Sequence, residues 1–239
     1  APAGSGVHLN GAPICSLPWP PSQWRGRLES PTGPVDTPEH LLAALQIAGV
    51  DDLMIEVRGG EVPILDGSAA PWLAAFTTVP VIPHQPAPLW SPPRSLILGG
   101  SEGWIAVRPA PRLSVRLTCD YPVLGRWSVH AEEIPNRESG ALSLHALAAA
   151  RTFGLQRWES MLRSRGLIRG VSVHNALIFD ESGTCLTPGG LRSQDEPARH
   201  KALDLLGDLM LLGTPLAAEL LVSRGGHQLH RRLVFALRQ

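Results

Sequence analysis

Residues 199–209, Arg-His-Lys-Ala-Leu-Asp-Leu-Leu-Gly-Asp-Leu, place His200 four positions before Asp204 in a segment with helical periodicity. Residues four apart on a helix share one face, so this imidazole and this carboxylate would point in the same direction. A pair of that kind can supply two ligands to one divalent metal ion. Pro197 suits a first helical turn. The pattern therefore predicts a metal-ligand helix over residues 197–212.

A second stretch at residues 37–40, Thr-Pro-Glu-His, reads as an N-cap, a helix-opening proline, an acid and a histidine. It predicts the start of an amphipathic helix over residues 38–48 and makes His40 the best candidate for a third ligand. Two histidines and one carboxylate form an open catalytic zinc set, which leaves a coordination position for water or substrate.

Each part of this pattern also has an ordinary structural explanation. A His and an Asp four apart are common on exposed helical faces, and a histidine in a first helical turn is more often a solvated surface residue. The combination favours chemistry, because Glu39 stands beside His40 and Lys201 stands beside His200. Both proposed histidine ligands therefore have a neighbour that can take part in catalysis.

Composition limits the class of protein. The chain has 239 residues, of which 44% are hydrophobic, enough for one large or two small domains. Basic and acidic residues both number 21, so we expect no nucleic-acid partner. The three cysteines are dispersed, which argues against a disulfide framework and fits a cytoplasmic location. No apolar run approaches the roughly 20 residues that a membrane span needs, and the N-terminal residues lack a signal-peptide pattern.

The order of predicted elements indicates an α+β protein whose two domains face each other across a cleft. The predicted parts are an N-terminal domain over 1–84 with Glu39 and His40, a proline-rich linker over 85–94, and a C-terminal domain over 95–239 with the metal helix at 200–208 and His227. In the first domain we predict helices at 38–48 and 69–76 and a strand at 53–57. In the second we predict strands at 95–98, 104–107, 113–118, 173–179 and 217–222, and helices at 142–151, 157–164, 197–212 and 226–237.

Five motifs, in this order, closely resemble the UDP-3-O-acyl-N-acetylglucosamine deacetylase family, whose members are zinc amidases of lipid A synthesis in Gram-negative bacteria. They are Glu-His-Leu-Leu-Ala-Ala-Leu at 39–45, Pro-Ile-Leu-Asp-Gly-Ser-Ala-Ala-Pro at 63–71, Arg-Thr-Phe-Gly at 151–154, the 199–209 stretch, and Gly-His at 226–227. The resemblance implies two similar domains of the ribosomal protein S5 domain 2 type. Each would be a sheet with helices on one face, and the helices would pack between the two sheets.

The resemblance also implies roles for individual residues. His40, His200 and Asp204 would be the Zn²⁺ ligands, in agreement with the spacing argument, and Glu39 would be the general base. Thr152 and His227 match the residues that assist the developing oxyanion and the leaving amine. Asp208 matches the carboxylate that orients His227 and raises its pKa.

For the substrate, the resemblance implies a small nucleotide sugar that carries an acyl chain. Lys201 matches a lysine near the phosphates, and Phe153 would pack on the substrate. Trp158, Met161 and Leu162, with Leu167 and Ile168, would line an apolar passage for the chain. The same residues could equally form ordinary core.

The chain departs from the family pattern at several places. Residues 170–176 read Gly-Val-Ser-Val-His-Asn-Ala where members commonly read Gly-Gly-Ser-x-Asp-Asn-Ala, and Trp158 stands where an aspartate is usual. Both departures fall in the 157–174 region that would form the acyl passage. The segment before Glu39 is also short, and the first strand that the family has there is not apparent.

The leading hypothesis is a cytoplasmic, monomeric zinc deacetylase acting on an acylated UDP-N-acetylglucosamine. Two alternatives remain open at this stage. One is a diverged paralogue that deacetylates another N-acetylated sugar or metabolite, and the other is a non-catalytic binding module that retains the fold.

Overall fold

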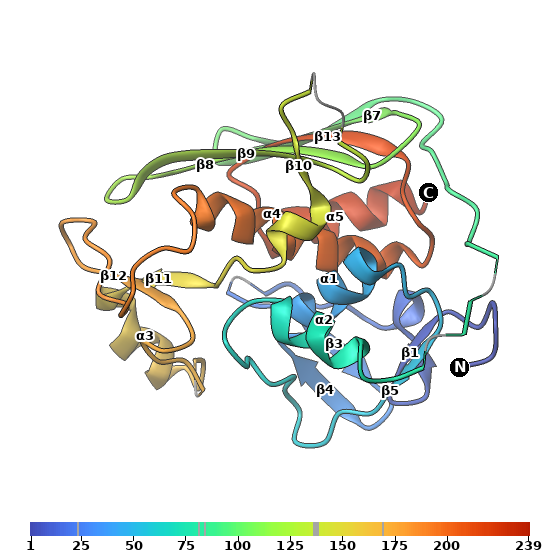
Figure 1. Ribbon diagram of the computed structural model, residues 1–239, viewed down its shortest axis with the longest axis horizontal. Helices are drawn as coiled ribbons and strands as arrows, with labels where there is room; N and C mark the ends of the chain where they lie inside the picture. The colour runs from blue at the N-terminus through green and yellow to red at the C-terminus, as the bar shows by residue number, and fades with distance from the viewer. Residues whose placement is uncertain (23, 81, 84, 136–138, 169) are drawn as a thin grey trace.

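The computed structural model describes residues 1–239 except 23, 81, 84, 136–138 and 169 (Figure 1). Its largest sheet has six strands in the order β10-β9-β8-β13-β7-β6. These strands are β6 (Leu96–Gly100), β7 (Gly103–Pro109), β8 (Ser114–Tyr121), β9 (Gly125–Glu132), β10 (Leu142–Ser143) and β13 (Ala218–Ser223). Strand β13 pairs parallel with β8 and antiparallel with β7. Its alternate residues Ala218, Leu220 and Val222 are buried, so one face of the sheet carries a core.

The other strands form three small sheets. β1 (Val7–Leu9) pairs with β2 (Ala12–Pro13) and β5 (Leu53–Ile55), β3 (Arg27–Ser30) pairs with β4 (Gly33–Asp36), and β11 (Phe153–Leu155) pairs with β12 (Leu177–Phe179). The α-helices are α1 (Glu39–Ala48), α2 (Ala70–Phe76), α3 (Glu159–Ser164), α4 (Glu196–Leu209) and α5 (His227–Leu237). Short 3₁₀ turns are η1 (Ile14–Ser16), η2 (Leu144–Leu147), η3 (Gln156–Trp158) and η4 (Met210–Leu212).

The helices form the middle of the molecule. In Figure 1, α4 and α5 lie under the six-stranded sheet, and α1 lies between α4 and the strands of the N-terminal segment. The mixed α+β class predicted from the sequence is therefore confirmed. The finer description, two similar domains of the S5 domain 2 type, stays a prediction, as do the boundaries 1–84, 85–94 and 95–239.

The segment around the predicted linker is irregular. Residues 85–94 contain no helix or strand, apart from an isolated bridge between Trp90 and Leu216 and a bend at residues 93–94. Residue 84, at the predicted boundary, lies outside the described residues. Among the described residues, none of the helices combines the length and the apolar character that crossing a bilayer demands.

Helix α1 is buried on all sides along its first two turns, because it packs against two cores. Leu41, Leu42 and Leu45 join a cluster formed with the N-terminal strands. The small side chains of Ala43 and Ala44 join the larger cluster beneath the six-stranded sheet. The helix ends at Gly49, whose φ of 64° is the left-handed conformation that glycine adopts most easily.

The first turn of α1 rests directly on Gly207 of α4. A Cβ placed on Gly207 would lie 2.1 Å from the backbone oxygen of Glu39, so only glycine allows this approach. Residues 39 and 40 open α1, and residues 200 and 204 lie on α4. The contact at Gly207 therefore brings the two predicted ligand-bearing helices together.

Two sequence predictions in the C-terminal half were wrong. Residues 142–151 were predicted as a helix, but they form β10, the 3₁₀ turn η2 and irregular backbone. The alanines there favour a helix, yet Leu142 pairs beside Ala131 of β9, and the backbone of residues 150–151 is bound by side chains of α4. These tertiary contacts outweigh a weak local propensity.

The predicted strand at 173–179 was too long, since only residues 177–179 are extended, as β12. Strands β9 and β11 were not anticipated. In β9 the exposed positions are Gly125, Arg126 and Ser128, and only Val129 and Ala131 are buried, which gives a weak hydrophobic signal. Four short strands, β1 to β4, precede α1 in the segment where no first strand was apparent.

Replacing Gly207 with Ala should destabilise the protein by about 1–3 kcal/mol, because the new methyl group would collide with the backbone of α1. Intrinsic propensity alone would give the opposite sign, since Ala is favoured over Gly in a helix interior by about 1 kcal/mol. The melting temperature, measured by circular dichroism, distinguishes the steric effect from the effect of helix propensity. Gly100→Ala is the matched control, because a Cβ there meets nothing within 4 Å. A Gly207→Ala melting temperature at or above the wild-type value would contradict the packing argument.

Candidate metal centre and active site

Helices α1 and α4 bring the three predicted metal ligands together. Nε2 of His40 lies 3.8 Å from Oδ1 of Asp204, and Nε2 of His200 lies 3.3 Å from the same oxygen. The centroids of the two imidazole rings are 5.0 Å apart. One ligand atom from each residue falls within 4.8 Å of the others, and all three residues are buried. Two ring nitrogens and one carboxylate oxygen thus converge on a single point.

The hydrogen bonds around this point fit a metal ion. Oδ1 of Asp204 is buried and receives no hydrogen bond from any residue that the structure describes, whereas Oδ2 accepts one from Lys201 at 2.8 Å. Nδ1 of His200 donates to the backbone oxygen of Ala150 at 3.0 Å, which leaves the Nε2 lone pair directed at Asp204. A buried carboxylate oxygen without a partner is costly, and a divalent cation would satisfy it.

The protonation states of the three residues also suit metal binding. Burial, together with the proximity of His200, lowers the pKa of His40 to about 3. Burial likewise lowers the pKa of His200. Burial alone would raise the pKa of Asp204, but His200 and Lys201 hold it well below its usual range. At neutral pH the site therefore offers two neutral imidazoles and one carboxylate, which are the forms that bind metal.

Beside the three predicted metal ligands, Glu39 faces His227. Oε1 of Glu39 lies 3.6 Å from Nε2 of His227, and Oε2 of Glu39 accepts the backbone N–H of Gly26 at 3.2 Å. Nδ1 of His227 donates to Oδ2 of Asp208 at 2.8 Å. The structure therefore brings together Glu39, His227 and Asp208, which were predicted from motifs far apart in the sequence.

The charges of this group are set by burial and by one another. Burial raises the pKa of Glu39 to about 7, against the opposing influence of His227. Burial would lower the pKa of His227, but the carboxylates of Asp208 and Glu39 raise it to about 10. A carboxylate with a pKa near neutrality can accept a proton, and a stable imidazolium can donate one.

His230 is a member of this group that the sequence analysis missed. It is completely buried, and its Nδ1 donates to the same Asp208 oxygen at 2.7 Å. Burial is the main cause of its lowered pKa. Its place one turn after His227 on a predicted helix was the available signal. Asp208 thus orients two imidazoles, of which only His227 lines the cavity.

Lys201 and Phe153 lie against the predicted metal ligands, and Thr152 precedes Phe153 in the chain. The Lys201 ammonium donates a hydrogen bond to Oδ2 of Asp204 and lies 5.7 Å from the centroid of the Phe153 ring. The Phe153 ring also contacts His200 edge-on, with centroids 6.3 Å apart. The backbone N–H of Thr152 donates to Gly67 at 2.8 Å, and the residue lines the cavity.

A cavity of about 390 Å³ opens from this cluster toward α3. Its apolar part is lined by residues of the predicted acyl passage and its neighbours, namely Leu155, Trp158, Leu162, Leu167, Ile168, Val171 and Ile178. Trp158 contacts Trp24 edge-on, with ring centroids 5.5 Å apart. Met161, which was also predicted to bind substrate, is not among the described lining residues.

Comparison with known proteins gives a consistent result. A family model described as UDP-3-O-acyl N-acetylglycosamine deacetylase matches residues 21–239. A protein of Thermosynechococcus vestitus named UDP-3-O-acyl-N-acetylglucosamine deacetylase is 43% identical over 212 residues, covering 86% of this chain and 70% of the relative. Proteins of the same name from Solibacter usitatus and a Synechocystis strain are 38% and 39% identical. They align with 84% and 86% of this chain and with 66% and 74% of their own lengths.

Proposed function

The chain belongs to the UDP-3-O-acyl N-acetylglycosamine deacetylase family, and we propose that it is a zinc-dependent amidase that removes the acetyl group from an acylated UDP-N-acetylglucosamine in lipid A synthesis. The observation that carries this proposal is the convergence of His40, His200 and Asp204 on one point, beside the Glu39 and His227 pair. The reaction adds water to the acetamide carbonyl, breaks its C–N bond and releases acetate and a free amine.

His40, His200 and Asp204 would hold the zinc ion, which would supply Lewis acidity and would lower the pKa of the attacking water to about 7. Glu39 is next to His40 in sequence, and its pKa of about 7 lets the carboxylate accept a proton from the attacking water at neutral pH. The Gly26 hydrogen bond to Oε2 holds this carboxylate in place and leaves Oε1 directed at the open site.

His227 is the proton donor in this proposal. Its Nδ1 is occupied by Asp208, so Nε2 is the nitrogen that faces Glu39 and the cavity. As an imidazolium, His227 stabilises the negative charge that develops on the carbonyl oxygen, and Nε2 then protonates the departing amine. Thr152 also lines the cavity and can add a hydroxyl donor.

The form of the cavity supports a substrate with an acyl chain. Its polar end holds the ligand cluster, and its other end is lined by leucine, isoleucine, valine and tryptophan side chains. An alkyl chain bound there would gain about 0.8 kcal/mol for each CH₂ group removed from water. The 157–174 region departs from the family pattern in sequence, yet its described residues still provide an apolar wall.

The proposal is tested directly by metal content and by product. We expect the purified protein to bind about one zinc per chain by elemental analysis, and a chelator to abolish acetate release until zinc is restored. Acetate release should be much faster from the acylated nucleotide sugar than from its non-acylated parent. Equal turnover of both would favour the paralogue reading, and zinc binding without turnover of either would favour a binding module.

Glu39→Gln should lower kcat by about 10²- to 10⁴-fold, because the amide keeps the shape of the side chain but cannot accept the proton. Zinc content should not change, since Glu39 is not a ligand. Glu29→Gln is the control, as it makes the same chemical change at an exposed site on β3. Undiminished kcat in Glu39→Gln would remove Glu39 from the mechanism.

The pH dependence of kcat/KM should report on His227. A proton donor works only below its pKa, so activity that needs the His227 imidazolium should fall as the pH rises through about 10. Asp208→Asn removes the carboxylate that raises this pKa, and the alkaline limb should therefore move to lower pH. Circular dichroism over the same range checks that the fold persists. An alkaline limb that stays in place in Asp208→Asn would exclude His227 as the donor.

A further inference from the structure

Two side chains from one turn of α4 bind the carbonyl and the N–H of a single peptide unit in another segment. His200 donates from Nδ1 to the carbonyl oxygen of Ala150 at 3.0 Å. Glu196, four residues earlier on the same helix, accepts the N–H of Arg151 at 3.0 Å through Oε1. The carbonyl and the N–H belong to the same peptide bond, between Ala150 and Arg151. Because that peptide is planar, fixing its N–H also fixes the direction of its carbonyl.

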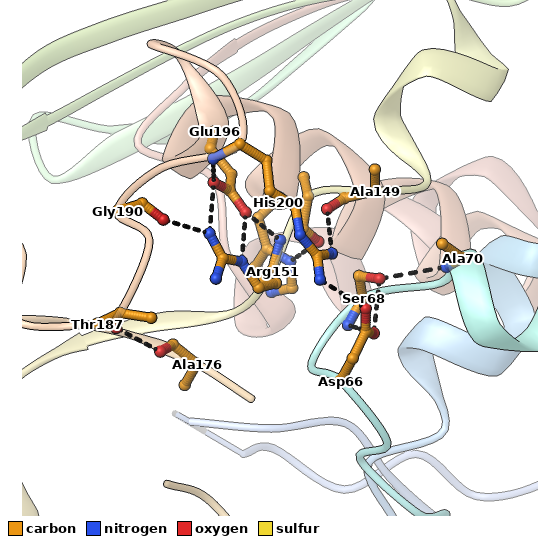
Figure 2. Close-up of polar contacts among 12 residues, drawn as sticks. Asp66, Ser68, Ala70, Ala149, Arg151, Ala176, Thr187, Gly190, Glu196 and His200 are labelled. Carbon is orange, nitrogen blue, oxygen red and sulfur yellow. Dashed lines mark hydrogen bonds and ion pairs between the residues drawn. The ribbon is translucent and has the colours of Figure 1, made fainter. Parts of the chain in front are cut away.

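Glu196 is built into this position by a dense set of donors. Its carboxylate is completely buried. It also accepts hydrogen bonds from Nε of Arg151 at 2.8 Å, from Nη2 of Arg151 at 3.1 Å and from the backbone N–H of Arg192 at 2.5 Å. Figure 2 shows Arg151 spanning from Glu196 to the carbonyl of Gly190. Both oxygens of the buried carboxylate are therefore satisfied, as a buried charge requires.

The peptide bond between Ala150 and Arg151 has a direct connection to the metal cluster. The hydrogen bond to Ala150 fixes which nitrogen of His200 carries the proton and how the ring is turned, so that Nε2 faces Asp204. Partners of this kind commonly control the affinity of a site for its metal. Neither Arg151 nor Glu196 belongs to the group of candidate ligands or to the described lining residues of the cavity.

We propose that Glu196 is a positioning residue for the metal centre, which acts through the Ala150–Arg151 peptide to hold His200 in its ligating orientation. This inference rests on the proposed zinc site for its meaning in catalysis. The geometry that it concerns exists in the protein without metal, and it can be examined there.

The first measurement uses the metal-free protein. Nitrogen NMR of the His200 ring, assigned by loss of the signal in His200→Ala, should show an Nδ1–H that exchanges slowly with water in the wild type. In Glu196→Gln the amide group places a donor against the N–H groups of Arg151 and Arg192, so the peptide should shift and the slow exchange should be lost. A second measurement, zinc binding by competition with a chelator, should show affinity lower by about 10- to 100-fold.

Two controls separate positioning from general destabilisation. Leu28→Ala removes a buried side chain from β3, so it should lower the melting temperature but leave the ring signal and the zinc affinity unchanged. Glu181→Gln makes the same chemical change in an exposed ion pair with Arg157, and it should alter none of the three. A Glu196→Gln protein with a wild-type ring signal and wild-type zinc affinity would overturn the proposal.

If Glu196→Gln does not fold, Arg151→Lys decides the question with the same two measurements. Lysine keeps the charge but cannot make the paired Nε and Nη2 contacts, so we expect faster exchange of the ring N–H and several-fold weaker zinc binding. Unchanged values in this variant would also overturn the proposal. A wild-type protein that keeps the slow ring signal but binds no zinc would instead refute the proposed function, and it would leave the positioning geometry intact.

Discussion

The contact of α1 with α4 at Gly207 is the constraint on which the rest of the site depends. Glu39 and His40 belong to the first turn of one helix, and His200, Asp204 and Asp208 belong to successive turns of the other. The two sets meet only because the backbone of Glu39 can approach α4 at a residue with no side chain. A separation larger by the width of a methyl group would move both His40 and Glu39 away from their partners.

The same approach forces an unusual number of ionisable groups into the protein interior. Removing charges from water is costly, and the structure offsets that cost by pairing them: Lys201 with Asp204, and His227 and His230 with Asp208. Two of the carboxylates assigned to metal binding and proton transfer nevertheless keep one oxygen without a normal hydrogen bond. Oδ1 of Asp204 receives no hydrogen bond within the described chain, and Oε1 of Glu39 faces His227 at 3.6 Å, beyond a normal hydrogen bond.

Support for the site extends into irregular backbone beyond the two helices. The segment around residues 150–152 has little regular structure, yet each of its peptides is held. From α4, the side chains of Glu196 and His200 bind the peptide unit between residues 150 and 151. The backbone N–H of Thr152 donates to the carbonyl oxygen of Gly67, and its carbonyl oxygen accepts the N–H of Leu177. A metal ligand needs a fixed ring orientation, and a hydrogen-bonded peptide provides it more rigidly than solvent would. Irregular backbone near a buried site is tolerable here because its polar groups are satisfied by neighbouring side chains and strands.

The helix that carries His200 and Asp204, the start of α1 and the mixed α+β class could be predicted from the amino-acid sequence, because they depend on local spacing. His200 and Asp204 stand four residues apart, and Thr37-Pro38 precedes Glu39 and His40. Family motifs added Asp208 and His227. The residues that face them from other segments could not be predicted in this way, because they depend on tertiary contacts. Residues 142–151 favour a helix locally, but they pair with β9 and bind side chains of α4 instead. His230 hydrogen-bonds Asp208, and Glu196 binds Arg151, which is 45 positions away in the chain. Spacing along a chain specifies one face of one helix, whereas contacts between distant segments depend on how the whole core closes.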